Sequence, residues 1–194
     1  MPNLSAFLSY VIITTFTPGP NNIMSMSNAS KYGFKKSFPF NVGVFFGFFI
    51  IIALCSFFSV TLFNLIPSIK PIMTYIGAAY ILWLAWKTYK SKPHNSDENG
   101  KSTNTFLAGF ALQFVNLKVI LYGITIVSTF IIPYYNSAIM LTFFSAILAF
   151  VGFVATCCWS IFGSLLHKFF VSHSRVVNIV MALLLVYCAV SLFH

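Results

Sequence analysis

The residues best suited to bind a solute form one short run, Thr17-Pro18-Gly19-Pro20-Asn21-Asn22, inside an apolar segment. No charged residue lies between Leu4 and Ala29, so this segment is predicted to cross a membrane. Proline inside a helix removes a backbone hydrogen bond and clashes with the preceding turn, so the helix should break here. Exposed backbone survives at membrane depth only where protein buries it or where it lines a wet cavity. The break is therefore a candidate binding site, and a simple proline kink is the alternative.

Proline suits the first turn of a helix, so Pro20 is expected to begin a second half-helix. The free N–H groups of Asn21, Asn22 and Ile23 would then face the cavity. Because a helix N-terminus carries about half a positive charge, it would attract a carboxylate. The candidate substrate-binding residues of this segment are Pro18, Gly19, Pro20, Asn21 and Asn22.

A second polar group lies in the apolar segment from Phe106 to Ile132, where Gln113, Asn116 and Lys118 are candidate substrate-binding residues. Lys118 is the one ionisable side chain predicted to lie deep within a span, which favours function over a snorkelling lysine. It could meet a substrate carboxylate or carry a proton. Gln113 and Asn116 share a helix face, whereas Lys118 is displaced from it unless the helix unwinds.

The composition indicates an integral membrane protein of the all-α class. Charged residues are 7% of the chain and hydrophobic residues 59%, and the apolar runs are long enough for helices across a bilayer. The net charge of +9 is spread over small clusters at span ends, which favours a topology signal over nucleic-acid binding. We expect the cysteines to be reduced core residues, namely Cys55, Cys157, Cys158 and Cys188.

Acidic and histidine side chains are predicted to lie away from the membrane interior. Asp97 and Glu98 fall in a polar stretch, and all four histidines fall near span ends or in loops. This pattern disfavours a carboxylate proton relay and a membrane metalloenzyme, so no metal or organic cofactor is expected. The chain also lacks a nucleotide-binding loop, so the energy for transport would come from a gradient or from the substrate.

Six apolar segments are predicted to span the membrane, namely Leu4–Ala29, Phe38–Phe63, Ile72–Trp86, Phe106–Ile132, Ile139–Gly163 and Val176–Phe193. The polar stretch 91–105 would link two three-span repeats, 1–90 and 106–194, within a single transporter domain. Gly43 and Gly47 have the spacing of small residues that allow close helix packing.

Basic residues mark the first, third and fifth connections, so these are predicted to be cytoplasmic and both termini to be periplasmic. A three-span half followed by another must be inverted with respect to the first. Inverted repeats whose corresponding spans are interrupted are typical of transporters with a binding site near the membrane midplane.

Several motifs resemble those of the LysE/RhtB family of amino-acid exporters. They are the Thr17 to Asn22 run, Gly33-Phe34-Lys35, Gly43-x3-Gly47, Gly77 to Lys87, Phe110 to Lys118 and Ala182 to Val190, and the last three resemble the cysteine/O-acetylserine exporter branch. Many family members carry Asn-Pro-Lys in the fourth span, whereas this chain has Leu117 in place of the proline.

The resemblance implies a multi-pass exporter in the bacterial inner membrane that moves cysteine, O-acetylserine or similar small neutral amino acids by alternating access. An exporter of homoserine, threonine or another amino acid is the first alternative, and a channel or scaffold subunit is the second. The expected partners are a small amino-acid substrate and membrane lipid, without nucleic acid. A homo-oligomer remains open.

Overall fold

The computed structural model describes residues 4–58, 72, 75–76, 78–90, 104–165 and 173–190. The described chain is helical and has no strand, which confirms the all-α prediction. Its helices are α1 (Leu4–Phe16), α2 (Pro20–Tyr32), α3 (Phe34–Phe57), α5 (Phe106–Val115), α6 (Leu117–Ile126), the π-helical η1 (Val127–Ile131), α7 (Ala138–Leu165) and α9 (Ser174–Val190). Residues 78–89 are also helical.

The long apolar helices α3 and α7 can each cross a membrane by length and composition. A third segment with this property is α5 together with α6 and η1, although it bends by 65° between Val115 and Leu117. The apolar helices α1 and α9 are shorter. The protein is therefore a membrane protein, while the arrangement of six spans in two repeats stays a prediction.

The predicted basic loop after the first span is wrong in length, because Gly33 alone separates α2 from α3. Lys35 and Lys36 lie in the first turn of α3. Their long side chains can extend from the helix to the membrane–water interface, so their charge does not end the helix. Gly33 has a φ of 80°, a conformation that residues with a Cβ adopt at a cost. Its N–H bonds the carbonyl of Ala29, which closes the end of α2.

The second predicted span is also shorter at its far end. The helix ends at Phe57, whereas the prediction placed the end at Phe63. Phe58 leaves the helical conformation, with φ of −113° and ψ of 23°, and residues 59–63 lie outside the described residues. The apolar run continues past the helix, so hydropathy alone could not place its end.

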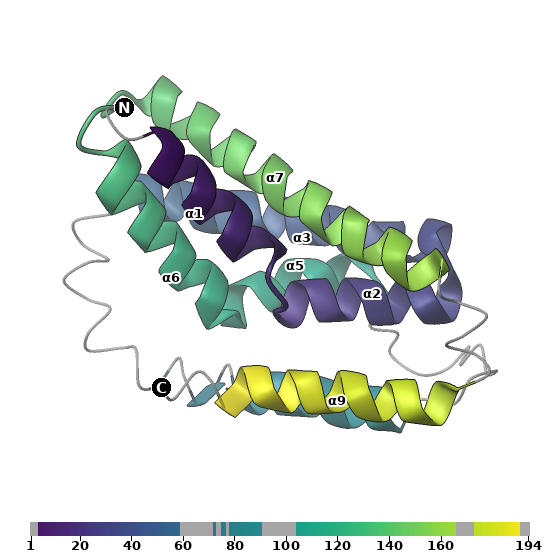
Figure 1. Ribbon diagram of the computed structural model, residues 1–194. Coiled ribbons are helices and arrows are strands. Elements are labelled where there is room, and N and C mark those ends of the chain that lie inside the picture. The colour runs from purple at the N-terminus through teal and green to yellow at the C-terminus, as the bar shows by residue number, and fades with distance from the viewer. Residues whose placement is uncertain are drawn as a thin grey trace.

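Helix α3 runs through the centre of the bundle and packs against both α5 and α7 (Figure 1). Gly43 and Gly47 lie where α3 meets α5. A Cβ at Gly43 would overlap the backbone oxygen of Phe106, and one at Gly47 would lie 2.7 Å from the backbone oxygen of Phe110. Gly109 of α5 faces the backbone of α3 in the same way. The two backbones are therefore in direct contact, which requires glycine.

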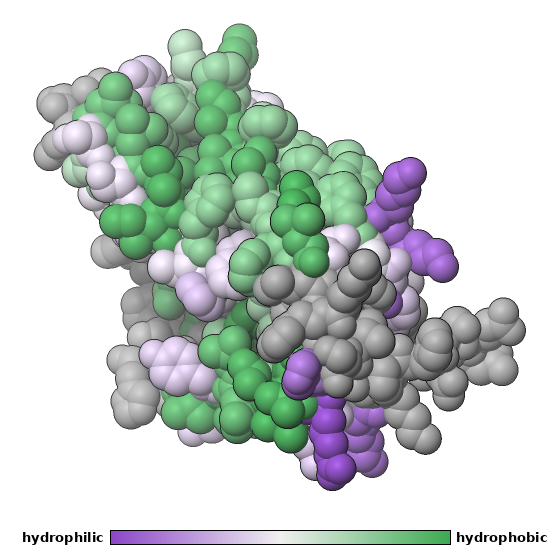
Figure 2. Space-filling view, turned by 45° about the vertical axis from the view of Figure 1, so that its right-hand side comes forward, coloured by the Kyte–Doolittle hydropathy of each residue, from purple (hydrophilic) through white to green (hydrophobic). Residues whose placement is uncertain are grey.

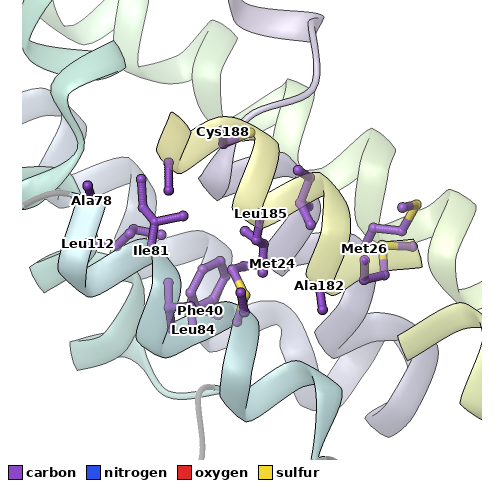
Figure 3. Packing of buried hydrophobic residues seen from close by; sticks show 14 of the residues in the cluster. Met24, Met26, Phe40, Ala78, Ile81, Leu84, Leu112, Ala182, Leu185 and Cys188 are labelled. Atoms are coloured by element: carbon purple, nitrogen blue, oxygen red, sulfur yellow. The ribbon is translucent and has the colours of Figure 1, made fainter. Parts of the chain in front are cut away.

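Helix α2 lies inside the bundle, where its residues from Asn22 to Ser30 are all buried. Figure 3 shows Met24 and Met26 of α2 beside Ala182 and Leu185 of α9. These residues belong to a first apolar core that α2, α3, α5, α9 and residues 78–89 share. A second core joins α1, α3, α6, η1 and α7. Because neighbouring helices surround α2, it need not be apolar to lie at membrane depth.

The outer surface is largely apolar, and hydrophilic side chains gather toward one side of the view in Figure 2. On α7, Ile139 is 82% exposed and Phe150 is 59% exposed, as expected for side chains that contact lipid.

Helix α7 also corrects one prediction on the cysteines. None of the four forms a disulfide, but Cys158 is exposed. An apolar position on a helix that faces lipid does not imply burial.

Candidate functional site

The first break in the chain separates α1 from α2. Helix α1 ends at Phe16, Gly19 is extended with φ of −167°, and Pro20 begins α2, as predicted. The expectation for Ile23 is wrong, because its N–H bonds the carbonyl of Gly19 at 2.9 Å as the first hydrogen bond of the new helix. Asn21 and Asn22 are left with backbone N–H groups that have no acceptor among the described residues.

Side chains near the break satisfy the last carbonyls of α1. The Asn22 amide nitrogen donates to the carbonyls of Thr15 and Thr17, at 2.9 Å each. The Thr17 hydroxyl donates to the carbonyl of Thr14 at 3.0 Å. A helix end that lacks such donors inside a membrane would leave costly unpaired oxygens. Asn22 therefore holds the α1 end of the break in place.

Two further donors reach the same helix end from distant parts of the chain. The indole N–H of Trp159, on α7, donates to the carbonyl of Phe16 at 3.2 Å. Lys118 Nζ, on α6, lies 3.0 Å from the Thr17 hydroxyl oxygen and 3.2 Å from the Thr17 carbonyl oxygen. A cation at the C-terminal end of a helix is favoured by the helix dipole. Lys118 thus binds the backbone break instead of extending to solvent.

The second break lies at Asn116, between α5 and α6. Asn116 is extended, with φ of −87° and ψ of 92°, and the two helices meet at 65°. The sharp bend forms although Leu117 replaces the proline of many family members. Because the helix ends and restarts here, the regular helical spacing no longer separates Lys118 from Gln113 and Asn116.

Hydrogen bonds between side chains connect the two breaks. Asn21 and Gln113 exchange a reciprocal pair, at 2.8 Å from Asn21 Nδ2 to Gln113 Oε1 and 3.1 Å from Gln113 Nε2 to Asn21 Oδ1. Asn116 Nδ2 donates to the same Asn21 oxygen at 3.1 Å. Gln113 and Asn116 are 0% and 2% exposed. Candidate residues that lie more than ninety positions apart in the sequence therefore meet in one buried network.

A cavity opens beside this network, at the border between the two apolar cores. It is lined by Thr14, Thr15, Gly19, Pro20, Asn21, Asn22, Val44, Phe48, Asn116, Lys118, Val119, Tyr122, Gly152 and Thr156. Pro18 and Gln113 are the two candidate residues that do not line it: Pro18 is exposed, and Gln113 lies behind Asn21. The volume open to the centres of water molecules is about 40 Å³. At roughly 10–15 Å³ per water, this holds a few waters and no amino acid.

Several lining residues were not candidates from the sequence. Thr14 and Thr15 lie shortly before the Pro-Gly-Pro break, and this pair of hydroxyls could have been noticed there. Tyr122 and Thr156 gave no such signal, because they stand alone in apolar helices. The hydrogen bond of Trp159 to the break could likewise be found only from the folded chain.

The cavity has groups that could bind an anion, beside the carbonyl ends of α1 and α5 that reach the same breaks. The N-terminal ends of α2 and α6 both reach it, through Asn21 and Asn22 in one case and through Asn116 and Lys118 in the other. Lys118 adds a formal charge, and the described residues include no carboxylate side chain to offset it. Half-helix N-termini and an ammonium group are suited to bind an anion.

Comparisons with known proteins show the family to which the chain belongs. A family model described as LysE type translocator matches residues 12–194. A protein of Escherichia coli strain K12 named cysteine/O-acetylserine efflux protein is 44% identical over 191 residues, which are 98% of this chain and 97% of that protein. Proteins of the same name from Escherichia coli O1:K1 and Shigella flexneri are also 44% identical with the same coverage. No solved structure matches the chain.

Proposed function

Because the chain belongs to the LysE type translocator family, we propose that it exports cysteine, O-acetylserine or similar small neutral amino acids from the cytoplasm. Family membership confirms the resemblance seen in the sequence and makes the protein an amino-acid exporter rather than an enzyme. The shared name of its relatives supports the substrate class. Homoserine or threonine is the alternative within the same site chemistry.

This proposal rests on a set of donors between the two breaks, which we call the anion site. They are the backbone N–H groups of Asn21 and Asn22 and the ammonium group of Lys118. The free N–H groups of Asn21 and Asn22 would bind the substrate carboxylate at the N-terminus of α2. Lys118 would add the counter-charge, since its ammonium already lies beside the break and 3.0 Å from the Cβ position at Gly19. An amino acid offers the carboxylate that this arrangement lacks.

Transport would proceed by alternating access of two inverted halves, 1–90 and 106–194, joined by the polar stretch 91–105. Hydrogen bonds join the two proposed halves at the breaks. Lys118 donates to the Thr17 hydroxyl, and Asn21 is hydrogen-bonded to Gln113 and Asn116. The volume open to water centres is small in this arrangement, and a relative movement of the halves would enlarge the cavity on one side to load the substrate. Lys118 would act as counter-charge or proton carrier during this movement.

The proposed location is the bacterial inner membrane, with both termini periplasmic. The basic residues near Gly33 and at the start of α9 support a cytoplasmic position for these connections. The apolar exposed face of α7 supports contact with lipid.

The test is counterflow in proteoliposomes with a panel of labelled amino acids, with and without a pH gradient. We expect saturable exchange of cysteine and O-acetylserine, and a loss of about 10- to 100-fold in Lys118→Met, because a charge-assisted hydrogen bond contributes about 1.5–3 kcal/mol. Lys35→Met, an exposed lysine in the first turn of α3, is the matched control and should keep wild-type exchange. Unchanged efflux in Lys118→Met would remove Lys118 from the mechanism. Absence of saturable exchange for every amino acid would favour a channel or scaffold subunit.

A further inference from the structure

The amide of Asn116 forms a hydrogen bond through its nitrogen but none through its oxygen within the part of the chain that the structure describes. Its nitrogen donates to Asn21, whereas its oxygen, Oδ1, is buried and has no donor among the described residues. Asn116 is 2% exposed and lines the cavity. A buried oxygen without a donor costs about 1–3 kcal/mol, so its retention at this place calls for an explanation.

A chain of hydrogen bonds fixes the orientation of this amide. Gln113 Nε2 donates to the carbonyl of Gly109 at 2.8 Å, which only a nitrogen can do, so Gln113 Oε1 must face the Asn21 nitrogen. Asn21 Oδ1 therefore faces Gln113 and Asn116, and it can accept only from the Asn116 nitrogen. The oxygen of Asn116 is consequently turned away from Asn21 and left as a buried acceptor without a donor in the described chain, on a residue that lines the cavity.

The free oxygen lies close to the anion site. The residue that bonds the Asn116 amide, Asn21, also presents its backbone N–H at the N-terminus of α2. Lys118 lies two residues after Asn116, in the first turn of α6, and its ammonium group reaches Thr17 at the first break. One free acceptor thus stands beside donors that suit a carboxylate. An α-amino acid has the complementary groups, with an ammonium donor and a carboxylate on a single carbon.

We propose that Asn116 Oδ1 accepts a hydrogen bond from the α-ammonium group of the substrate. This inference rests on the proposed function and adds that the site reads both charged ends of the zwitterion. The break at Asn116 would then help to select the substrate. Because Asn116 lies outside the regular helices, its amide oxygen is available to the substrate. A carboxylate that lacks an α-amino group would leave the oxygen unpaired and should be rejected.

Three compounds separate the two charged groups. Cysteine carries both, 3-mercaptopropionate lacks only the ammonium group, and cysteamine lacks only the carboxylate. We would measure how each inhibits the exchange of labelled cysteine under reducing conditions, and how each raises the melting temperature of the purified protein. In the wild type, 3-mercaptopropionate should bind about 10- to 100-fold more weakly than cysteine, as expected for a lost charge-assisted hydrogen bond.

Variants at two positions assign this preference to the oxygen. Asn116→Ala should bring the affinity ratio of cysteine to 3-mercaptopropionate close to one, whereas Asn116→Asp keeps an acceptor and should preserve the ratio. Asn21→Ala removes the bond that orients the Asn116 amide and should therefore lower the ratio in the same direction as Asn116→Ala. A purely structural role for Asn116 would change the rate in all three variants and leave the ratio unaltered.

The outcomes distinguish the inference from the function on which it rests. A wild-type ratio retained in Asn116→Ala would overturn the role of Asn116 and leave the exporter in place, and so would a wild type that binds cysteine and 3-mercaptopropionate equally. If Asn116→Ala does not transport, the melting-temperature shifts of Asn116→Ala and Asn116→Asp still give the ratio. A wild type that exchanges no amino acid would instead reject the proposed function.

Discussion

Individual residues in this protein act through single contacts that can be tested one at a time. Trp159 and Asn22 each supply donors to carbonyl groups that would otherwise be unpaired at the end of α1. Gly47 acts by the absence of a side chain, since the backbone oxygen of Phe110 and the Gln113 side chain both lie 2.7 Å from its Cβ position. The close contact between α3 and α5 therefore depends on the absence of a Cβ at this position.

Gly47→Ala should lower the melting temperature of the purified protein. Its methyl group would meet backbone on α5 and force the helices apart, a change that typically costs about 1–3 kcal/mol. Gly152→Ala is the matched control on α7, because its Cβ would lie 3.5 Å from the ring of Phe48, an ordinary contact. Thermal unfolding in one detergent compares the two. Equal melting temperatures would show that α3 and α5 are less tightly held than described.

Two helices in this bundle break beside the cavity, and two different sequences produce the two breaks. Pro-Gly-Pro ends α1 because proline cannot continue a helix. At the second break, extended backbone at Asn116 and the hydrogen bond of its side chain to Asn21 give a 65° bend without proline. Val119 and Ile120 then donate their N–H groups to the carbonyl of Asn116, which starts α6.

Leu117→Pro should be tolerated. Leu117 is the first residue of α6, where proline suits the helix, and the extended backbone of Asn116 suits the position before proline. Ile120→Pro, which also replaces a buried apolar side chain, should abolish folding or transport because it removes the hydrogen bond to Asn116. Expression level and labelled amino-acid efflux measure both. A Leu117→Pro variant as damaged as Ile120→Pro would contradict this account of the break.

The sequence was sufficient for the helical class, for both breaks and for most residues that meet there, because proline, amides and a lysine are costly inside a membrane. It could not show that Lys35 and Lys36 lie in a helix, because a lysine side chain can extend from a helix to water. It also could not assign Thr156 or Trp159 to the site. Helix α7 is apolar on several faces, so no periodic pattern marks the face that points to the break.

At the scale of the whole molecule, each broken segment packs on one of the two long helices. Helix α5 packs on α3 through Gly43, Gly47 and Gly109, while α2 packs on α7, where Gly163 meets the backbone of Met26. The start of α1 and the turn between η1 and α7 lie at one end of the bundle, and the Gly33 turn lies at the opposite end (Figure 1). The predicted topology likewise places these two ends on opposite sides of the membrane.

Labelling of single cysteines should verify the orientation. In a variant without the four native cysteines, Asn136→Cys in the exposed turn before α7 should react with a membrane-impermeant maleimide in cells whose outer membrane is permeabilised. Lys35→Cys should react only after the inner membrane is opened. Both positions are exposed, so access is the only difference between them. The reverse pattern would invert the proposed topology.

The bonds between the two breaks also bear on how the protein behaves when no cargo is present. An empty carrier that changes its access side must give up the contacts of Lys118 with Thr17 and those of Asn21 with Gln113 and Asn116, with nothing to replace them. Bound substrate would supply new partners for the same groups, so reorientation with cargo should be faster than without it. Such a carrier would exchange solutes across the membrane more readily than it would change its access side while empty.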